Sequence, residues 1–285
     1  MCLIAPIAFG CNKLGLGNGS PTAPTTPPAP GSSIVYAAIG ASDVTGVGSS
    51  VLCPLADCPN GMGYVQVAVR TLRSQGFTIA VSNLGLPTAV IGPDFQALGR
   101  QFGRTIEGNY LEFELPFVSA NAGLVTIFAG PNEVNTITAA LGGGAGGTDQ
   151  VGYINSQVRA FSSDLTALVD GVRGRAGGAR LVILNVPNLA GLPLLTSASL
   201  PQRQAAQLAS VGMTTAVNRL AGSTVAVVDL MCDTRSYQPS IYSSDGFHPN
   251  DGGYAFIAGE VVRAVTTAYP APAASCGPMT IVPNP

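Results

Sequence analysis

The 285-residue sequence has no tryptophan, a single histidine and few charged residues. Charged residues make up 10% of the chain, against about 25% in typical soluble domains, and the formal net charge is −2. Because there is no basic surplus, we expect no nucleic-acid partner and no polyanion. A surface with so few lysines and glutamates, and rich instead in serine, threonine, asparagine, glycine and alanine, is typical of proteins outside the cytoplasm.

The chain also lacks an apolar run long enough to cross a bilayer, which takes about 20 residues. The short apolar run 3–10 resembles the end of a secretory signal, and it precedes Cys11, where bacterial lipoproteins carry a lipid. Residues rich in Gly, Ser, Thr and Pro follow and indicate a flexible tether. We therefore predict a leader and tether over 1–32, a folded domain over 33–270 and a C-terminal tail over 271–285. The protein is expected to be a monomer that is secreted, periplasmic or held at the outer surface by a lipid on Cys11.

Cysteine is scarce, and its number suits an exported protein. Apart from the two cysteines of the leader, four remain, which favours two disulfides. We predict Cys53–Cys58 and Cys232–Cys276, although four cysteines allow three pairings. A zinc site is the alternative interpretation, but the only histidine lies elsewhere and no second close cysteine pair exists. We expect no metal.

Apolar runs alternate with helical patterns through the expected folded domain. The runs are short and largely apolar throughout, as in strands that are buried on both faces of a sheet: 34–39, 77–81, 124–128, 181–186 and 225–230. Apolar residues at helical spacing follow in 62–72, 151–172, 206–220 and 254–265, and 92–116 resembles a broken helix. This order predicts an α/β protein, a three-layer α/β/α sandwich around a five-stranded parallel sheet.

Polar residues with catalytic potential follow three of these expected strands. Ser42 follows the first strand, Asn132 the third, and the pair Asp245 and His248 the fifth. Each alone is more often an ordinary loop residue, but the carboxyl ends of parallel strands share one sheet edge, where open α/β sheets bind ligands. Serine needs a base to act as a nucleophile, and histidine is suited to that task. A nearby carboxylate can fix the histidine tautomer, and an amide can donate to an oxyanion.

These residues resemble the short sequence blocks of the SGNH, or GDSL-type, hydrolases. The family's first block, Gly-Asp-Ser-x-x-x-Gly, is similar to 40–46, with alanine in place of the aspartate. The third block, Gly-x-Asn-Asp, is similar to 130–133, with glutamate last, and the fifth, Asp-x-x-His, is present in full at 245–248. In the second block Asn83 fits, but Thr88 stands where the family has glycine. The resemblance spans residues 33–268.

The resemblance implies a flavodoxin-like sandwich and the hydrolysis of carboxylic esters without a metal or other cofactor. Ser42 would be the nucleophile, His248 the general base and then acid, and Asp245 the residue that orients His248. The backbone N–H groups of Ser42 and Thr88 and the side chain of Asn132 would form the oxyanion hole.

The loops after the second and third expected strands are apolar and suggest a shallow acyl-binding groove. Its candidate walls are Leu84, Leu86 and Val134, with Val90, Ile91 and Ile137 beside them. If these side chains face the core, Phe95 and Phe102 are the alternative. We expect a small-molecule or lipid ester with a short to medium acyl chain. Two alternatives remain open: deacetylation of a polysaccharide at the same site, and a surface binding protein without turnover.

Overall fold

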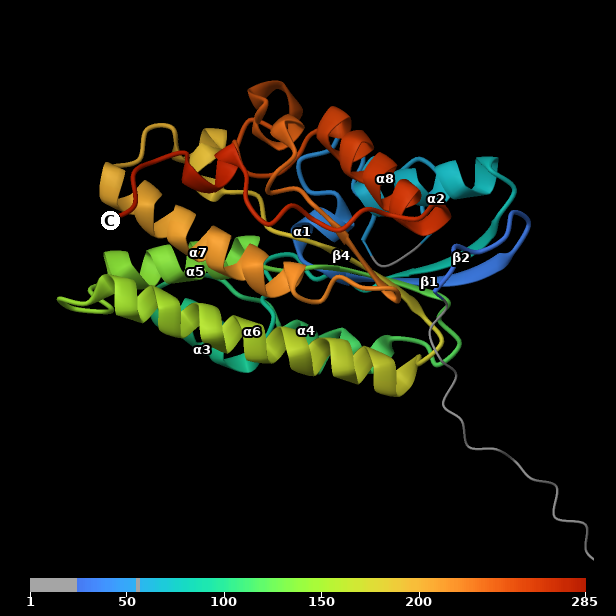
Figure 1. Cartoon of the computed structure of the whole chain (residues 1–285), viewed down its shortest axis with the longest axis horizontal. Helices are drawn as coiled ribbons and strands as arrows, with labels where there is room; N and C mark the ends of the chain where they lie inside the picture. Colours follow the sequence, from blue (N-terminus) through green and yellow to red (C-terminus); the bar gives the residue numbers. More distant parts are fainter. Residues whose placement is uncertain (1–24, 55–56) are drawn as a thin grey trace, which may run out of the picture.

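The computed structural model describes residues 25–54 and 57–285. At its centre lies a five-stranded sheet in which every neighbouring pair is parallel, in the order β2-β1-β3-β4-β5 (Figure 1). The strands are β1 (Ser33–Gly40), β2 (Thr78–Asn83), β3 (Leu124–Phe128), β4 (Arg180–Leu184) and β5 (Val225–Val228). This is the strand order of flavodoxin-like folds, whose ligand site lies between β1 and β3, where the order reverses. The predicted parallel sheet is confirmed.

Helices cover both faces of the sheet, as Figure 1 shows. Alternate residues of β1 point to opposite faces: Tyr36 and Ala38 enter one core, and Ala37 and Ile39 enter the other. The first core is closed by α2 (Tyr64–Ser74) and α8 (Asp251–Thr266). The second is closed by α3 (Pro93–Gln101), α5 (Pro131–Gly142), α6 (Gln150–Arg175) and α7 (Leu200–Asn218). The three-layer sandwich is therefore confirmed.

The segment 92–116 is broken, as its glycines predict. It contains α3, the short α4 (Tyr110–Phe113) and the 3-10 turn η1 (Leu115–Phe117). The sequence pattern does not predict α5, because only a few apolar residues mark its buried face. Pro131 opens that helix, and the Glu133 side chain accepts the backbone N–H of Gly130, which satisfies a donor at its start.

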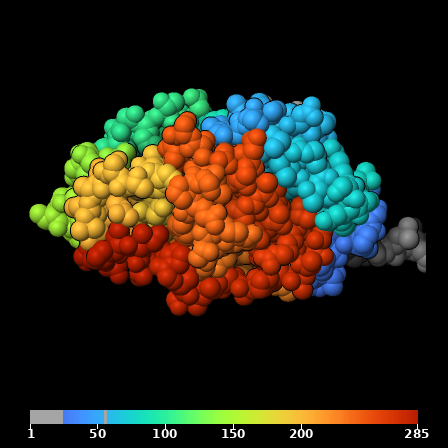
Figure 2. Space-filling model, turned by 90° about the horizontal axis from the view of Figure 1, so that it is seen from above, coloured from blue at the N-terminus to red at the C-terminus, as the bar shows by residue number. Residues whose placement is uncertain are grey.

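The C-terminal segment 271–285 is packed against the domain. The disulfide Cys232–Cys276 anchors it, as predicted. Beyond the disulfide, the side chain of Asn188 donates to the carbonyl of Pro278, and that of Gln207 donates to the carbonyl of Val282. Figure 2 shows this segment, in dark red, alongside the yellow segment that includes the start of α7. The folded part of the chain thus continues past residue 270.

The predicted disulfide Cys53–Cys58 is wrong, because the two cysteines are not joined. Cys53 is buried. Its backbone N–H donates to the carbonyl of Thr45, and its backbone carbonyl accepts from the side chain of Asn83 at the end of β2. The N–H of Cys58 is instead bonded to the Gln66 side chain on α2. The backbone groups of the two cysteines are therefore bonded to different partners, and the short sequence spacing does not lead to a disulfide.

Within the described residues, no helix has both the length and the apolar character that crossing a membrane requires. The expected leader, including Cys11, lies outside the described residues, apart from the end of the tether that precedes β1.

Candidate active site

Ser42 is presented by a tight turn at the carboxyl end of β1. The turn begins at Gly40, whose φ is 153°, and passes into the short helix α1 (Ser42–Thr45). A Cβ atom on Gly40 would lie 2.5 Å from the Val44 side chain and 2.9 Å from the carbonyl oxygen of Phe128, so only glycine fits there. As the first residue of a helix, Ser42 has a backbone N–H without an intrahelical acceptor.

The side chains of Ser42, His248 and Asp245 lie in a hydrogen-bonded row. His248 Nε2 is 2.8 Å from Ser42 Oγ, and His248 Nδ1 is 2.6 Å from Asp245 Oδ2. Asp245 Oδ1 also accepts the N–H groups of Phe247 and His248 and the hydroxyl of Ser243. Partial burial raises the pKa of Asp245, but the bonds from the imidazole, the two N–H groups and the hydroxyl outweigh it and lower the pKa to about 2.

The ionised carboxylate determines the protonation of the histidine ring. Since a carboxylate can only accept hydrogen bonds, His248 Nδ1 carries a proton, and Nε2 of the neutral ring is an acceptor. The Ser42 hydroxyl can therefore donate to Nε2. This arrangement can withdraw a proton from Ser42 and later return one to a leaving group.

The loops that carry Ser42 and His248 are tied together. Ser50, in the loop after α1, donates through its N–H and its hydroxyl to the carboxylate of Asp251 at the start of α8, both at 2.7 Å. At Gly48, which has a φ of 93°, a Cβ would lie 2.6 Å from the Pro249 carbonyl oxygen and 2.7 Å from His248 Cβ. This close approach fixes the histidine loop against the serine loop, although the two are distant in sequence.

Thr88 has an unusual backbone conformation. Its φ of 68° makes it the one non-glycine residue at positive φ in the described ranges. A β-branched residue there is strained, at a cost on the order of 1–3 kcal/mol. Its side-chain Oγ1 accepts the N–H of Glu107 at 3.1 Å, which supports the conformation. Thr88 therefore has the left-handed backbone conformation that glycine adopts most readily.

The side-chain amide of Asn132 is held at both ends. Its Nδ2 donates to the carbonyl of Ala89 at 2.9 Å, and its Oδ1 accepts from Arg104 Nη2 at 3.3 Å. An amide nitrogen carries two hydrogens, so one N–H of Asn132 remains for another acceptor. Asn132 lines the same groove as Ser42 and Thr88.

Two buried glutamates bind backbone N–H groups around the site. Glu133 accepts the N–H groups of Ile91 and Gly130, and Glu114 accepts the N–H of Gly40 at 2.8 Å. Burial raises the pKa of Glu133, and its N–H partners and the Arg104 charge counteract this, which leaves the pKa at about 7. Burial also raises the pKa of Glu114. Glu114 was not predicted, because nothing in its local pattern distinguishes it from a surface carboxylate of a short helix.

The site opens into a groove of about 390 Å³. Besides the predicted Ser42, Thr88, Asn132, Asp245 and His248, its walls contain six residues that the sequence did not predict: Val47, Pro87, Arg104, Asn135, Leu194 and Phe247. Four of these lie in loops and Leu194 lies in the short 3-10 turn η3 (Pro193–Leu195), where no periodicity marks an inward-facing side chain. The sixth, Asn135, lies on α5, which the sequence did not predict.

The predicted acyl wall is wrong. Val134 is fully buried in the core, as are Val90, Ile91 and Ile137. The helical period of α5 explains this: Asn132 and Asn135 share the groove face, whereas Val134 and Ile137 face the core. Leu84 and Leu86 pack against the core and do not line the groove. Of the alternative pair, Phe95 is also a core residue, and Phe102 packs against Gly143.

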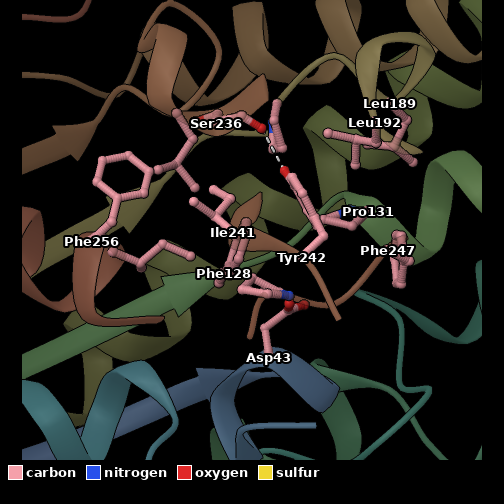
Figure 3. Close-up of a pocket in the computed structure, with 14 residues that line it drawn as sticks. Asp43, Phe128, Pro131, Leu189, Leu192, Ser236, Ile241, Tyr242, Phe247 and Phe256 are labelled. Carbon is pink, nitrogen blue, oxygen red and sulfur yellow. Dashed lines mark hydrogen bonds between the residues drawn. The ribbon is translucent and has the colours of Figure 1, made fainter. Parts of the chain in front are cut away.

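A small second cavity lies beside the groove (Figure 3). It is about 30 Å³ and mostly apolar, and Phe247 lines both the cavity and the groove. Asp43 also reaches it, and burial raises the pKa of that carboxyl group. A cavity of this size holds about one water molecule and has no room for an acyl chain.

Comparison with known proteins agrees with this fold. The model of the GDSL-like lipase/acylhydrolase family matches residues 31–256. The chain therefore belongs to this family of ester hydrolases, which includes esterases and lipases. No curated protein matches the chain.

Several solved structures share the fold. An extracellular lipase from Streptomyces rimosus is 19% identical, with a TM-score of 0.57 over 81% of this chain and 99% of that one. A lipase from a goat rumen metagenome is 17% identical, with a TM-score of 0.55 over 82% of this chain and 98% of that one. The acetylxylan esterase Axe2 from Geobacillus stearothermophilus is 15% identical, with a TM-score of 0.53 over 86% of this chain and 99% of that one. At these levels of sequence identity, the similarity shows a shared fold and nothing more.

Proposed function

We propose that the chain is a serine esterase that hydrolyses carboxylic esters through an acyl-enzyme on Ser42. The observation that carries the proposal is the row of two hydrogen bonds from Ser42 through His248 to Asp245, at 2.8 and 2.6 Å. The low pKa of Asp245 keeps its carboxylate ionised, so it stabilises the imidazolium that forms when His248 takes a proton. The disulfide Cys232–Cys276 and the low charge support a site of action outside the cytoplasm.

The reaction proceeds in two halves. Ser42 Oγ attacks the ester carbonyl carbon as its proton moves to His248 Nε2, and the carbonyl oxygen becomes an oxyanion. When the bond to the alcohol breaks, the departing oxygen takes that proton from His248. Water then attacks the acyl-Ser42 carbonyl, gives a proton to His248 and releases the carboxylic acid, while His248 returns the proton to Ser42. The N–H groups of Ser42 and Thr88 and the remaining N–H of Asn132 stabilise each oxyanion.

Replacing Asn132 with alanine is expected to lower kcat by roughly 10²–10³ with little change in KM, because the lost donor acts on charge that develops in the transition state. Steady-state kinetics with p-nitrophenyl acetate measure this. Asn121→Ala, at an exposed asparagine just before β3, is the matched control. A rise in KM alone would instead make Asn132 a contact of the bound substrate.

The groove has two different sides. Leu194 and Phe247 lie on the His248 side, and the Leu194 N–H bonds to the carbonyl of Gly246 in the histidine loop. Arg104 and Asn135 lie on the Asn132 side. Because His248 must protonate the departing oxygen, the alcohol occupies the apolar side and the acyl group the polar side. We therefore propose apolar alcohols esterified with short acyl chains.

The acyl preference can be measured directly. We expect kcat/KM for p-nitrophenyl esters to peak between acetyl and hexanoyl, and emulsified long-chain triglyceride to be a poor substrate. Each buried methylene contributes about 0.8 kcal/mol, but the adjoining cavity is too small to extend the groove. A rate that keeps rising through dodecanoyl would contradict the short groove. The acyl series uses one alcohol throughout, so its trend reports the acyl side alone.

A second candidate is deacetylation of a polysaccharide at the same site. The polar acyl side that Arg104 and Asn135 form suits an acyl group as short as acetyl, and Axe2, which has the same fold, is an acetylxylan esterase. Acetate release from acetylated xylan that exceeds turnover of p-nitrophenyl acetate would favour this candidate. A binding protein without turnover, the other alternative, would not react with a fluorophosphonate probe.

A further inference from the structure

We propose that Arg104 is a positioning residue of the oxyanion hole. Its guanidinium fixes the side-chain amide of Asn132 in the one orientation that presents an N–H to the oxyanion. This inference rests on the proposed esterase function and adds to it a residue that belongs to none of the family's sequence blocks.

Arg104 makes a two-pronged contact with Asn132. Its Nη1 donates to the Asn132 backbone carbonyl at 3.1 Å, and its Nη2 donates to the side-chain Oδ1 at 3.3 Å. The planar guanidinium fork suits two acceptors of one residue, which a lysine ammonium matches poorly. The backbone of Arg104 is held as well, since its backbone N–H donates to the carbonyl of Gly99 at 2.9 Å. This bond ties the loop back to α3.

The neighbours of the amide exclude the flipped orientation. As it lies, Oδ1 faces the guanidinium, and Nδ2 faces the carbonyl of Ala89. A flip would place the amide NH₂ against the guanidinium donors and the amide oxygen against the carbonyl oxygen, so both hydrogen bonds would become repulsive contacts. The remaining Nδ2–H is then constrained, and Asn132 lines the groove with Ser42.

Arg104 also places a positive charge beside the groove. Burial lowers its pKa, while the nearby Glu133 raises it, and an arginine side chain stays protonated in proteins. Among the described residues that line the groove, Arg104 is the one lysine or arginine. A cation bonded to Oδ1 polarises the amide and makes its N–H a stronger donor. The Glu133 carboxylate is occupied with the N–H groups of Ile91 and Gly130.

A double-mutant cycle tests whether Arg104 acts through Asn132. Arg104→Met, Asn132→Ala and the double variant are compared by kcat and KM on p-nitrophenyl acetate. We expect Arg104→Met to lower kcat about tenfold to a hundredfold with KM nearly unchanged, the range for a lost hydrogen bond to a charged group. In the Asn132→Ala background, the same substitution should change kcat less than about twofold, because no amide remains to be positioned.

Arg100→Met is the matched control. Arg100 lies in the last turn of α3, close to the same loop, and bonds the carbonyl of Ile106, not Asn132. This variant should therefore keep the wild-type kcat. If Arg104→Met does not fold, Arg104→Lys serves in the same cycle, because it keeps the charge and loses the fork. Its kcat should fall below that of the wild type, and this loss too should vanish in the Asn132→Ala background.

An equal loss of kcat in both backgrounds, or a loss that appears only in KM, would overturn the inference. Either would make Arg104 a substrate contact or a general structural residue. Failure of the proposed function looks different, since the wild-type protein would then neither hydrolyse esters nor react with a fluorophosphonate. If the wild type turns over and Ser42→Ala does not, but Arg104→Met matches the wild type, only the role of Arg104 is refuted.

Discussion

Ser42→Ala is expected to reduce ester turnover by roughly 10⁴–10⁶ and to abolish labelling by a fluorophosphonate probe, because the atom that forms the acyl bond is gone. The residual rate reflects the oxyanion donors and substrate binding alone. The fold should be unaffected, since the Ser42 side chain bonds only to His248 among the described residues. Single-turnover kinetics and mass analysis of the labelled protein measure both effects.

The control for this variant lies in the same loop. Ser49 bonds the carbonyls of Gly46 and Val51 and does not line the groove. Ser49→Ala should therefore label and turn over like the wild type. If Ser42→Ala still hydrolysed esters at the wild-type rate, Ser42 would not be the nucleophile, and the acyl-enzyme mechanism would be wrong.

His248→Ala is expected to cause a comparable loss of kcat, since the Ser42 hydroxyl is a weak nucleophile without a base. The chain has no second histidine, so no neighbouring imidazole can replace it. Added imidazole should restore part of the rate, because the substitution leaves a ring-sized space between Ser42 and Asp245, which both line the groove.

The rescue distinguishes a lost base from a lost fold. Imidazole should raise the rate of His248→Ala in a saturable manner and leave that of Ser42→Ala unchanged, because the latter has no nucleophile to activate. Wild-type turnover by His248→Ala without imidazole would show that another group takes the Ser42 proton.

The sequence predicts the sheet and the row of Ser42, His248 and Asp245 for a shared reason. Strands buried on both faces are apolar throughout, and the residues that follow a parallel sheet's strands gather at one edge wherever they lie in the chain. The groove walls follow no such rule. Leu194 lies in the short 3-10 turn η3 and Phe247 in an irregular loop, and the face that Val134 presents depends on the unpredicted helix α5.

The role of Arg104 and the pairing of the cysteines also depend on contacts that no local sequence pattern predicts. The role of Arg104 depends on how the loop after α3 folds back to Asn132, a contact between residues 28 positions apart in the sequence. The Cys53–Cys58 pairing fails for a related reason, since Cys58 is tied to α2 rather than to its neighbour in sequence. Cys232 and Cys276, which are far apart in sequence, are joined because the C-terminal segment returns along the domain.

The left-handed backbone of Thr88 has a consequence for the empty enzyme. Glycine at this position can leave the positive-φ region easily, so a glycine loop can drift between turnovers. A threonine is strained there and keeps this conformation only because its surroundings hold it, among them the bond that its hydroxyl accepts from the N–H of Glu107. In the proposed mechanism, the Thr88 N–H therefore keeps its direction before any ester arrives. The strain arises once, when the chain folds, and no reorientation of this donor is needed in each catalytic cycle.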